Sequence, residues 1–336
     1  MSTVKVGIIG AGRIAYVHAH NIVRNIPFAE VKGIADPYLT DEGRKWIAEL
    51  GIENVYDSHT KLLEDKEISA IIICSATPTH TQMIRESVLA GKDVFCEKPM
   101  DLDSDVIRET NKIIEKSGRK VQVGFNRRFD HNYAALQQAV ATKKIGDLHI
   151  CKVNSRDPAP PPAHYVKESG GLFKDMTIHD FDMVRFLTGS EVDEVFAYGA
   201  VLVDKAIGEA GDIDTAIVAM KMKSGAIAYI DNSREAVYGY DQRAEVFGSK
   251  GSMETGNDVS NTAVFSGKDG VVAEKPLWFF LERYTAAFTS EMIAFLEAIR
   301  DDKEVPVGPI DGLNSILIAE AALRSLKSGK SEKVIY

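Results

Sequence analysis

The stretch VKVGIIGAGRIA, residues 4–15, decides the fold of the first part of this chain. Its apolar start predicts a buried β-strand, and the residues after Arg13 continue with the spacing of a helix. Between them Gly10 permits a tight turn, Gly12 lets the backbone approach a bound group closely, and Ala15 is small enough for close packing of helix on strand. A strand that passes through such a turn directly into a helix indicates the start of a βαβ unit.

The same alternation of strand and helix continues to residue 125. Short segments rich in β-branched residues are separated by amphipathic segments, and this rhythm predicts a mostly parallel sheet that is covered by helices on both faces. One more helix is expected over residues 131–146, ending at Gly146. The expected strands are residues 4–10, 29–36, 68–75, 93–98 and 120–125.

After Gly146 apolar residues alternate with polar ones, as in strands that bury one face. Short connections that contain glycine join these segments, which favours hairpins and therefore a large, mostly antiparallel open sheet. Helices are expected against this sheet at residues 172–188, 283–300 and 311–327. The expected strands are residues 147–156, 193–203, 214–223, 225–233, 241–249 and 251–256.

We therefore expect an α/β protein with two domains, since 336 residues exceed the size of one comfortable core. Residues 1–125 are expected to form an N-terminal Rossmann domain with a doubly wound parallel sheet. Residues 126–336 are expected to form a C-terminal α+β domain that binds the substrate and carries the contacts for oligomerisation.

The composition is that of an ordinary soluble globular protein, with 45% hydrophobic and 26% charged residues. A net charge of -9 argues against nucleic acid and against an anionic membrane as partners. Cys74, Cys96 and Cys151 lie in apolar segments without a CxxC pair, as reduced cysteines of a cytoplasmic protein do. We expect no signal peptide, and the apolar runs are too short to cross a membrane.

The glycine turn together with Asp36 predicts a dinucleotide site. A pyrophosphate would lie at the N-terminus of the helix after Gly12, where free N–H groups and the helix dipole favour negative charge. Asp36 ends the second expected strand and can accept hydrogen bonds from a ribose diol. Because no Lys or Arg stands beside Asp36, a 2′-phosphate would meet a carboxylate, so NAD is favoured over NADP. The alternative is a glycine turn that is only structural.

Lys98 ends another of the expected parallel strands. Ligands of open α/β sheets bind beyond the carboxyl ends of the strands, so Lys98 is expected to project toward the nicotinamide end of the crevice. Pro99 keeps Lys98 out of helical geometry. The alternative is an ordinary surface lysine in an exposed turn.

Residues 170–189, GGLFKDMTIHDFDMVRFLTG, place a carboxylate and an imidazole on a face that a helix should bury. In a helix that begins at Leu172, Asp175 and His179 lie one turn apart, on the same side as its apolar residues. Burying an unpaired polar group is costly, so this face is expected to be half core and half wall of an active site. The alternative is a buried structural histidine paired with a helical aspartate.

Two neighbouring groups of residues have plainer explanations. Asp180 and Asp182 next to His179 could suggest a metal, but no second cluster completes a tetrahedral set, so no metal is expected. Arg127 and Arg128 could clamp a sugar phosphate, or they could form ion pairs where a helix begins.

Several short motifs occur in order along the whole chain. They are GAGRIA (10–15), SATPTH (75–80), EKP (97–99), GFNRRFD (124–130) and the Asp175-xxx-His179 pair. Together they resemble the glucose–fructose oxidoreductase and inositol dehydrogenase (Gfo/Idh/MocA) family. The SRDPAPPP loop and the YGYDQRAEVFGSKG segment (238–251) are most similar to its inositol 2-dehydrogenase branch.

The resemblance implies roles for individual residues. Lys98, Asp175 and His179 would form the catalytic triad. The NAD site would be lined by Gly10, Gly12, Arg13, Ile14, Asp36, Ser75, Thr77, His80, Glu97 and Lys98. The polyol would contact Lys98, Asn126, Arg127, Asp157, Asp175, His179 and Tyr240.

The activity expected from this set is NAD-dependent oxidation of a secondary hydroxyl of a cyclic polyol. An imidazole titrates near neutral pH, so His179 can act as general base, while Lys98 supplies positive charge where alkoxide character develops. Myo-inositol or another inositol isomer, oxidised to an inosose, is the first choice of substrate, and a cytoplasmic homotetramer is expected. The alternatives are a dehydrogenase of an aldose or anhydrosugar, and a non-catalytic regulator that senses a nucleotide.

Overall fold

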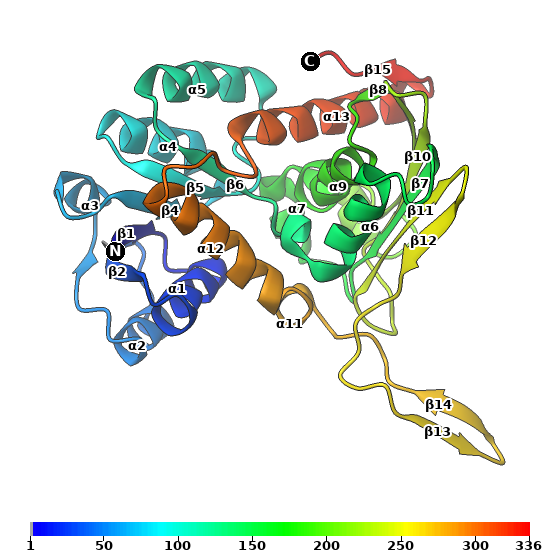
Figure 1. The fold of residues 1–336 in the computed structure, drawn as a ribbon, viewed down its shortest axis with the longest axis horizontal. Helices are drawn as coiled ribbons and strands as arrows, with labels where there is room; N and C mark the ends of the chain where they lie inside the picture. Colours follow the sequence, from blue (N-terminus) through cyan, green and yellow to red (C-terminus); the bar gives the residue numbers. More distant parts are fainter. Residues whose placement is uncertain (1–2) are drawn as a thin grey trace. The chain divides into compact units, whose positions relative to one another are not determined.

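The structure is a computed structural model that describes residues 3–336, except for the side chains of Ala163 and Lys167. Its contacts divide the chain into two compact units (Figure 1). Unit 1 contains the chain up to Asn126 together with Ala286–Ile316, and unit 2 contains Arg127–Thr285 and Leu317–Tyr336. The predicted domain boundary between residues 125 and 126 stays a prediction. A late segment that the sequence assigns to the second domain packs within unit 1.

A six-stranded parallel sheet is the centre of unit 1. Its strand order, β3-β2-β1-β4-β5-β6, changes direction between β1 and β4, as in doubly wound folds. This confirms the predicted Rossmann fold. The strands are β1 (Val4–Ile9), β2 (Ala29–Ala35), β3 (Val55–Tyr56), β4 (Ala70–Ile73), β5 (Asp93–Glu97) and β6 (Val121–Gly124).

Helices cover both faces of this sheet. Figure 1 shows α4 and α5 on one side and α1 and α12 on the other. The core beneath α1 and α12 combines side chains of β1, β2, β4 and β5 with apolar residues of both helices, among them Ile22 and Phe295. The helices of unit 1 are α1 (Arg13–Asn25), α2 (Asp41–Glu49), α3 (Thr60–Glu64), η1 (Thr77–Thr79), α4 (His80–Leu89), α5 (Ser104–Ser117) and α12 (Thr285–Arg300), which begins on a residue of unit 2.

The late segment of unit 1 is held to the sheet by hydrogen bonds. The N–H of Val123 donates to the carbonyl of Val307 over 3.0 Å, so the chain after α12 lies along β6. The Gln122 side chain donates through Nε2 to the carbonyl of Glu291 over 3.1 Å. This segment therefore completes unit 1, although it lies more than 150 residues further along the chain than β6.

The turn between β1 and α1 has no room for a side chain at Gly10. The residue has φ +99°, and a Cβ there would lie 2.7 Å from the carbonyl oxygen of Cys74, which directly follows the neighbouring strand β4. Gly12, which precedes α1, has φ -78° and nothing within 4 Å of a Cβ. The fold therefore requires glycine at position 10, and the open space beside Gly12 is available to a ligand.

A seven-stranded sheet is the centre of unit 2, in the order β12-β11-β7-β10-β9-β8-β15. Only β7 and β10 pair in parallel, so the prediction of a mostly antiparallel sheet is confirmed. The strands are β7 (Leu148–Arg156), β8 (Val192–Ala200), β9 (Thr215–Met222), β10 (Ile227–Ser233), β11 (Asp241–Gly248), β12 (Gly251–Thr255) and β15 (Glu332–Lys333).

One face of this sheet is covered by helices and the other is exposed. Helices α6 and α9 pack against β7 and β11 (Figure 1). On the opposite face Ile217 and Ile227 are more than half exposed. The helices of unit 2 are η2 (Asn126–Phe129), which begins on the last residue of unit 1, α6 (His131–Ala141), α7 (Ala163–Ser169), α8 (Gly171–Asp175), α9 (Ile178–Thr188), α10 (Lys205–Glu209), α11 (Phe280–Arg283) and α13 (Pro309–Ser328), which begins in unit 1.

The helix predicted over residues 172–188 is broken into α8 and α9, so the prediction of one continuous helix is wrong. At the break the N–H of Thr177 reaches back to the carbonyl of Leu172 over 2.9 Å, and the N–H of His179 bonds to Met176. The Thr177 hydroxyl donates to Oδ1 of Asn232 on β10 over 2.6 Å. The N–H of Thr177 reaches back five residues instead of four, so this turn contains one residue more than a turn of α-helix. The hydrogen bond to Asn232 holds the turn in place, and the spacing of residues along the chain does not predict it.

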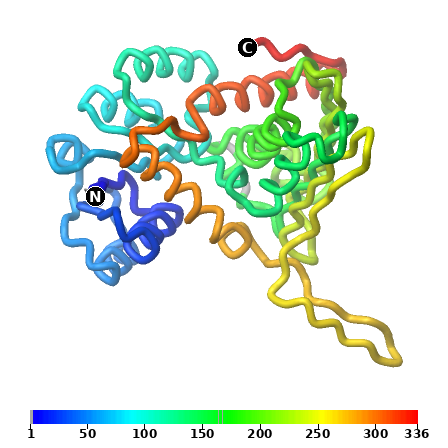
Figure 2. The backbone as a smooth tube through the Cα atoms, viewed as in Figure 1, coloured from blue at the N-terminus to red at the C-terminus, as the bar shows by residue number. Residues whose placement is uncertain are grey.

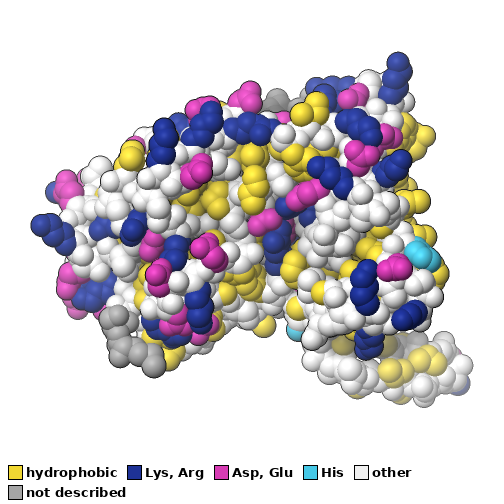
Figure 3. All heavy atoms as spheres, turned by 45° about the horizontal axis from the view of Figure 1, so that its top comes forward, with side chains coloured by type: hydrophobic (Ala, Val, Ile, Leu, Met, Phe, Trp, Pro, Cys, Tyr) yellow, Lys and Arg dark blue, Asp and Glu magenta, His cyan; other side chains and the backbone are white. Residues whose placement is uncertain are grey.

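A two-stranded ribbon of β13 (Val264–Gly267) and β14 (Gly270–Ala273) projects from unit 2 (Figure 2). Its apolar side chains, including Phe265 and Val272, are largely exposed. Figure 3 shows charged side chains of both signs interspersed over the face in view. Within residues 3–336 no helix has an apolar stretch of the length that crossing a membrane requires.

Replacing Gly10 with Ala is expected to lower the free energy of unfolding by at least about 1–3 kcal/mol, because the backbone is left-handed there and the methyl group meets a carbonyl oxygen. Urea denaturation measures the change. Gly12→Ala is the matched control and should stay within about 0.5 kcal/mol of the natural protein. Equal stability of the two variants would contradict this account of the turn.

Candidate active site

Most of the predicted nucleotide-binding residues of unit 1 lie at one edge of its parallel sheet. Gly10 follows β1, Asp36 follows β2, Ser75 follows β4, and Lys98 follows β5. These strands are neighbours in the sheet, and parallel strands end at the same edge. Residues that are far apart in sequence are therefore brought to the edge where doubly wound folds bind their ligands.

The glycine turn and Asp36 are joined directly. The N–H of Ala11 donates to Oδ2 of Asp36 over 2.8 Å, and the N–H of Tyr38 donates to Oδ1 over 2.8 Å. The carboxylate is thus fixed beside the turn that opens α1, while its remaining lone pairs can accept from hydroxyls. Exposed Gly12 leaves space at the helix N-terminus. A nucleotide with a ribose diol and a pyrophosphate fits this donor and acceptor set.

His80 joins two of the loops at this edge. It is buried, with Nδ1 lying 2.8 Å from the carbonyl oxygen of Pro99 and Nε2 lying 2.9 Å from that of Ser75. The imidazole therefore ties the chain after β4 to the chain after Lys98. Thr77, which begins η1, is half-buried in the same loop. In this structure His80 supports the loops through hydrogen bonds to the main chain.

Lys98 directly follows β5 and lies between Glu97 and Pro99. It is half-buried, and its peptide bond to Pro99 is cis. The residue before it, Glu97, pairs in register with Gly124 of β6, and its Oε1 lies 2.7 Å from Nε2 of His18 on α1. The strand end that carries the lysine is therefore anchored on both sides.

In unit 2 two aspartates share one arginine. Arg234 donates through Nη1 to Oδ2 of Asp157 over 3.2 Å and through Nη2 to Oδ2 of Asp175 over 3.0 Å. The hydroxyl of Tyr165 donates to the other oxygen of Asp175 over 3.1 Å. Asp157 follows β7, Arg234 follows β10, and Asp175 ends α8, so three elements meet here. The predicted residues Asp157 and Asp175 are brought together by a residue that was not predicted.

The charges of this group perturb one another. Burial raises the pKa of Asp157 to about 6, and the Arg234 guanidinium limits the rise. Burial opposes the charge of Arg234, but Asp175 and Asp157 together hold its pKa above the ordinary value. The group therefore places one cation between two carboxyl groups.

His179 lies in the first turn of α9, just after the break, and is half-buried. Its position depends on the buried chain of hydrogen bonds behind it. Asn232 accepts from Thr177 and donates through Nδ2 to Oδ2 of Asp180 over 2.9 Å. The sheet thereby fixes the residues on either side of His179.

Arg127 is held by polar side chains of the interior of unit 2. It is buried, with Nη1 lying 2.6 Å from Oδ1 of Asp180 and Nη2 within hydrogen-bond distance of the Ser155 and Tyr240 hydroxyls. Arg128 forms a two-bond ion pair with Asp182. Both arginines are thus engaged with aspartates of α9, which favours ion pairs over a phosphate clamp.

Two residues of this site were missed from the sequence. Arg234 and Asn232 stand in the segment DNSRE, where nothing in the spacing separates a supporting polar residue from a surface one. The available signal is that Asn232 continues the buried face of β10, where the alternation predicts an apolar residue. Asp180 was considered only as a metal ligand, whereas the structure pairs it with Arg127.

The two halves have complementary chemistry. The carboxyl edge of the unit 1 sheet carries groups that suit a nucleotide, and Lys98 lies at the end of one of its strands. Unit 2 contains an imidazole and carboxyl groups, and carboxylate oxygens can accept hydrogen bonds from hydroxyls. Asn126, which the sequence assigns to the substrate, is buried and is the last residue of the first segment of unit 1.

Two family models match the chain. Residues 4–125 match the oxidoreductase family with an NAD-binding Rossmann fold. Residues 133–254 match the GFO/IDH/MocA C-terminal domain. The first match covers the glycine turn, Asp36 and Lys98, and the second covers Asp175 and His179.

Similar proteins match along nearly the whole chain. The myo-inositol 2-dehydrogenase of Thermotoga maritima is 44% identical over 334 residues, covering 98% of this chain and 98% of that protein. The inositol 2-dehydrogenase of Rhizobium meliloti is 42% identical over 328 residues, covering 96% and 97%. The crystal structure of scyllo-inositol dehydrogenase from Lactobacillus casei with NAD(H) and scyllo-inositol has a TM-score of 0.92 and 33% identity, covering 99% of each chain.

Replacing Arg234 with Met is expected to destabilise the protein by about 3–5 kcal/mol, because it leaves two partly buried carboxylates without their shared cation. The loss should grow as the pH rises from 4 to 8. Burial raises the pKa of Asp157 and Arg234 lowers it, so removing the guanidinium raises this pKa further. The folded variant then loses more stability than the natural protein as the carboxyl ionises.

Denaturation at several pH values measures this loss, and Arg44→Met is the control at an exposed helical arginine. Adding Asp157→Asn to the Met variant should remove much of its pH dependence. A loss that is the same at pH 4 and pH 8 would show that Arg234 does not serve these carboxylates.

Proposed function

The chain belongs to the GFO/IDH/MocA oxidoreductase family, and from this premise we propose that it is an NAD-dependent inositol 2-dehydrogenase. Its substrate in this proposal is myo-inositol or another inositol isomer, and its product is the corresponding inosose. Oxidation removes the hydroxyl proton and a hydride from the same carbon, which leaves a ketone.

One observation carries the proposal. The chain contains Lys98, Asp175 and His179, and it aligns with inositol 2-dehydrogenases over nearly its full length. A regulator that only senses a nucleotide has no need of a lysine at the strand end together with an imidazole and a carboxylate. The complete set therefore supports an enzyme.

We assign the chemistry to these residues as follows. His179 accepts the proton of the hydroxyl that is oxidised, as imidazoles do near neutral pH. Lys98 places its ammonium where the oxygen becomes negative and so stabilises the developing alkoxide. Asp175 favours the protonated imidazole or holds a neighbouring hydroxyl. NAD, when bound, accepts the hydride from the substrate carbon.

The binding of NAD is assigned to the carboxyl edge of the unit 1 sheet. The N-terminus of α1 after Gly12 would hold the pyrophosphate, and Asp36 would accept from the ribose diol. The remaining residues proposed to line this site are Gly10, Arg13, Ile14, Ser75, Thr77, His80, Glu97 and Lys98.

The substrate class follows from the acceptors and donors of unit 2. Asp157 and Asp175 present carboxylate oxygens that Arg234 and Tyr165 hold in place. Ring hydroxyls can donate to such oxygens and accept from the arginine, so a neutral polyol suits the group. A carboxylic acid would set its charge against both aspartates, and an aliphatic alcohol would leave them unpaired. We also propose contacts from Asn126, Arg127 and Tyr240.

We further propose that the protein acts as a homotetramer in the cytoplasm. Support for assembly comes from the uncovered face of the unit 2 sheet, where apolar side chains of five strands lie on one side. They are Ile150, Tyr198, Ile217, Ile227 and Phe247. Exposed apolar side chains gathered on one face of a sheet are usually covered by another protein surface. The three cysteines are free and buried, as is usual in a reducing compartment.

The function is tested with a panel of inositol isomers, aldoses and anhydrosugars in the presence of NAD. Reduced nicotinamide should accumulate with at least one inositol, and myo-inositol or scyllo-inositol should be among the best substrates. Inert inositols together with rapid oxidation of an aldose would leave the family assignment and overturn the substrate. No turnover with any member would favour the regulator.

Variants of the catalytic set provide the matched test. Lys98→Met and His179→Asn should lower kcat by about a hundredfold or more, while NAD binding stays within a few-fold. The residual rate of the histidine variant should lack the acid limb of the pH profile. The Arg44→Met variant, changed at an exposed site, should turn over normally. An unchanged acid limb would assign the base to another residue.

The tetramer is tested by light scattering at micromolar concentration, which should give four chain masses. Ile217→Lys together with Ile227→Lys should produce smaller species, because charges would then lie on the proposed interface. Leu89→Lys is the control, since Leu89 is an even more exposed apolar residue outside the sheet face. A monomer in the natural protein would refute the proposal.

A further inference from the structure

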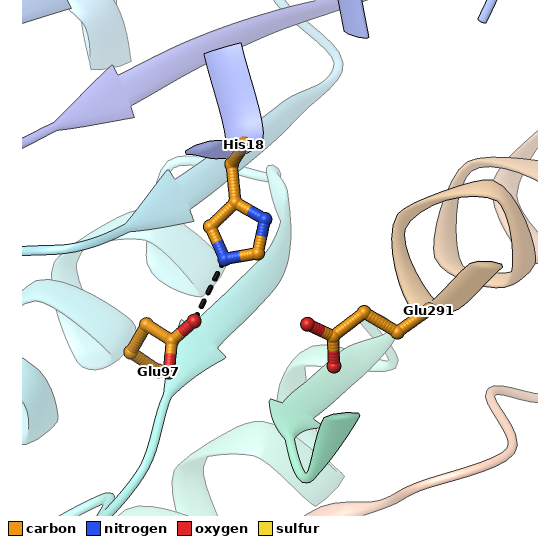
Figure 4. A group of neighbouring side chains, drawn as sticks. All are labelled: His18, Glu97 and Glu291. Atoms are coloured by element: carbon orange, nitrogen blue, oxygen red, sulfur yellow. Dashed lines mark hydrogen bonds and ion pairs between the residues drawn. The ribbon is translucent and has the colours of Figure 1, made fainter. Parts of the chain in front are cut away.

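Unit 1 contains a buried cluster of an imidazole and two carboxylates that the proposed mechanism does not use. His18 comes from α1, Glu97 from the end of β5, and Glu291 from α12, and Figure 4 shows the carboxylate of Glu291 pointing toward the other two. Their nearest nitrogen and oxygen atoms all lie within 4.8 Å of one another. His18 and Glu291 are 0% exposed.

The polar atoms of this cluster are only partly satisfied. Nε2 of His18 lies 2.7 Å from Oε1 of Glu97, which pairs these two residues. Within residues 3–336, Nδ1 of His18 and both carboxylate oxygens of Glu291 have no hydrogen-bond partner. The rings of Phe95 and Phe288 stand edge-on to His18 and keep the surroundings apolar. A charged carboxylate in such a place is costly unless something neutralises it.

A cation and a proton are the two ways to neutralise Glu291. Metal bonds to nitrogen and oxygen are about 2.0–2.2 Å long, so neighbouring ligand atoms around one ion lie roughly 3 Å or more apart. Nε2 of His18 and Oε1 of Glu97 are closer than this, at 2.7 Å, as in a hydrogen bond. In the described part of the chain no lysine or arginine pairs with Glu291. The geometry therefore favours a proton.

We propose that Glu291 is a positioning residue of the nucleotide site, an uncharged carboxylic acid that completes a buried junction with His18 and Glu97. The junction holds α1, whose N-terminus faces the pyrophosphate, and the end of β5, which carries Lys98. This role rests on the proposed function, because it concerns the placement of residues that bind NAD and act on the substrate.

Other contacts show that α12 is fixed against the same elements. The Thr289 hydroxyl of α12 donates to Oδ1 of Asn21 on α1 over 3.0 Å, and Gln122 of β6 donates to the carbonyl of Glu291. The Glu97 carboxylate also has little room to move, because a Cβ on Gly124 of β6 would lie only 3.1 Å from its Oε2. Helix α12 therefore has little freedom to move the Glu291 carboxyl away from the cluster.

The titration of Glu291 sets the direction in which the stability of the protein should change with pH. Burial raises its pKa well above the ordinary value of a glutamate, and the charge of Glu97 acts in the same direction. The titratable groups that face it are His18 from α1, Glu97 from β5 and the buried Cys74 after β4. Since the folded state holds the proton more tightly than the unfolded chain, this residue makes the protein less stable as the pH rises above its unfolded pKa.

The first test compares the melting temperature of Glu291→Gln with that of the natural protein between pH 5 and pH 8. Glutamine has the shape of the neutral acid but does not ionise. The two proteins should melt at similar temperatures near pH 5, and the variant should gain steadily on the natural protein toward pH 8. Glu297→Gln is the control on the same helix, at a side chain that is 44% exposed, and should follow the natural protein.

A constant difference, or a Gln variant that loses ground as the pH rises, would overturn the proposal. The second result would mean that the carboxyl is ionised, and elemental analysis of the purified protein would then reveal whether a metal ion is bound. Infrared spectra of the natural protein provide an independent test if the variant does not fold. The carbonyl band of a protonated carboxylic acid should be present at pH 7.

The second test separates positioning from bulk stability through NAD affinity measured by calorimetry. Glu291→Ala should weaken NAD binding by roughly tenfold, since small displacements of a binding group have large effects. Glu291→Gln should restore most of the affinity. Because this measurement needs no substrate, it remains valid if every inositol proves inert. Equal affinity of the Ala variant and the natural protein would show that the junction does not position the nucleotide site.

Discussion

The close approach of Gly10 to the carbonyl of Cys74 is the constraint on which the nucleotide half depends. It lets β1 lie directly beside β4 at the point where the strand order reverses, and it turns the chain into α1 with its N–H groups directed to the sheet edge. Asp36 is held to the same turn through the N–H of Ala11. A single left-handed glycine thus sets the geometry for a pyrophosphate and for a ribose.

Unit 2 depends on paired charges rather than on a turn. Arg127 and Asp180 form a buried ion pair, and Asn232 connects that pair to Thr177 at the break between α8 and α9. Such a pair is costly to bury but costlier to break, so it specifies one arrangement of helix and sheet. These buried contacts hold the break in place, and the break sets the positions of Asp175 and His179. Arg234 then adds the cation that lets Asp157 and Asp175 lie close together.

Much of the fold could be predicted from the sequence because the periodicities are strong. The alternation before residue 125 and the period of two after Gly146 correspond to the two observed sheets. The Rossmann signature works because Gly10, Gly12 and Asp36 are close enough in sequence for local geometry to relate them. The short helix α7, the ribbon of β13 and β14, and the return of residues 286–316 to unit 1 carry no comparable local pattern.

The sequence by itself determined the residue types that the chemistry needs and the strand ends on which several of them stand. Only the tertiary structure decided how they are supported, since the partners come from distant segments. His18 meets Glu97 79 residues away, and Arg234 meets Asp175 59 residues away. Hydrogen bonds and ion pairs act over a few ångströms in space, whatever the separation along the chain. The break between Asp175 and His179 has the same origin, because a hydroxyl bound to β10 outweighs the local preference for a continuous helix.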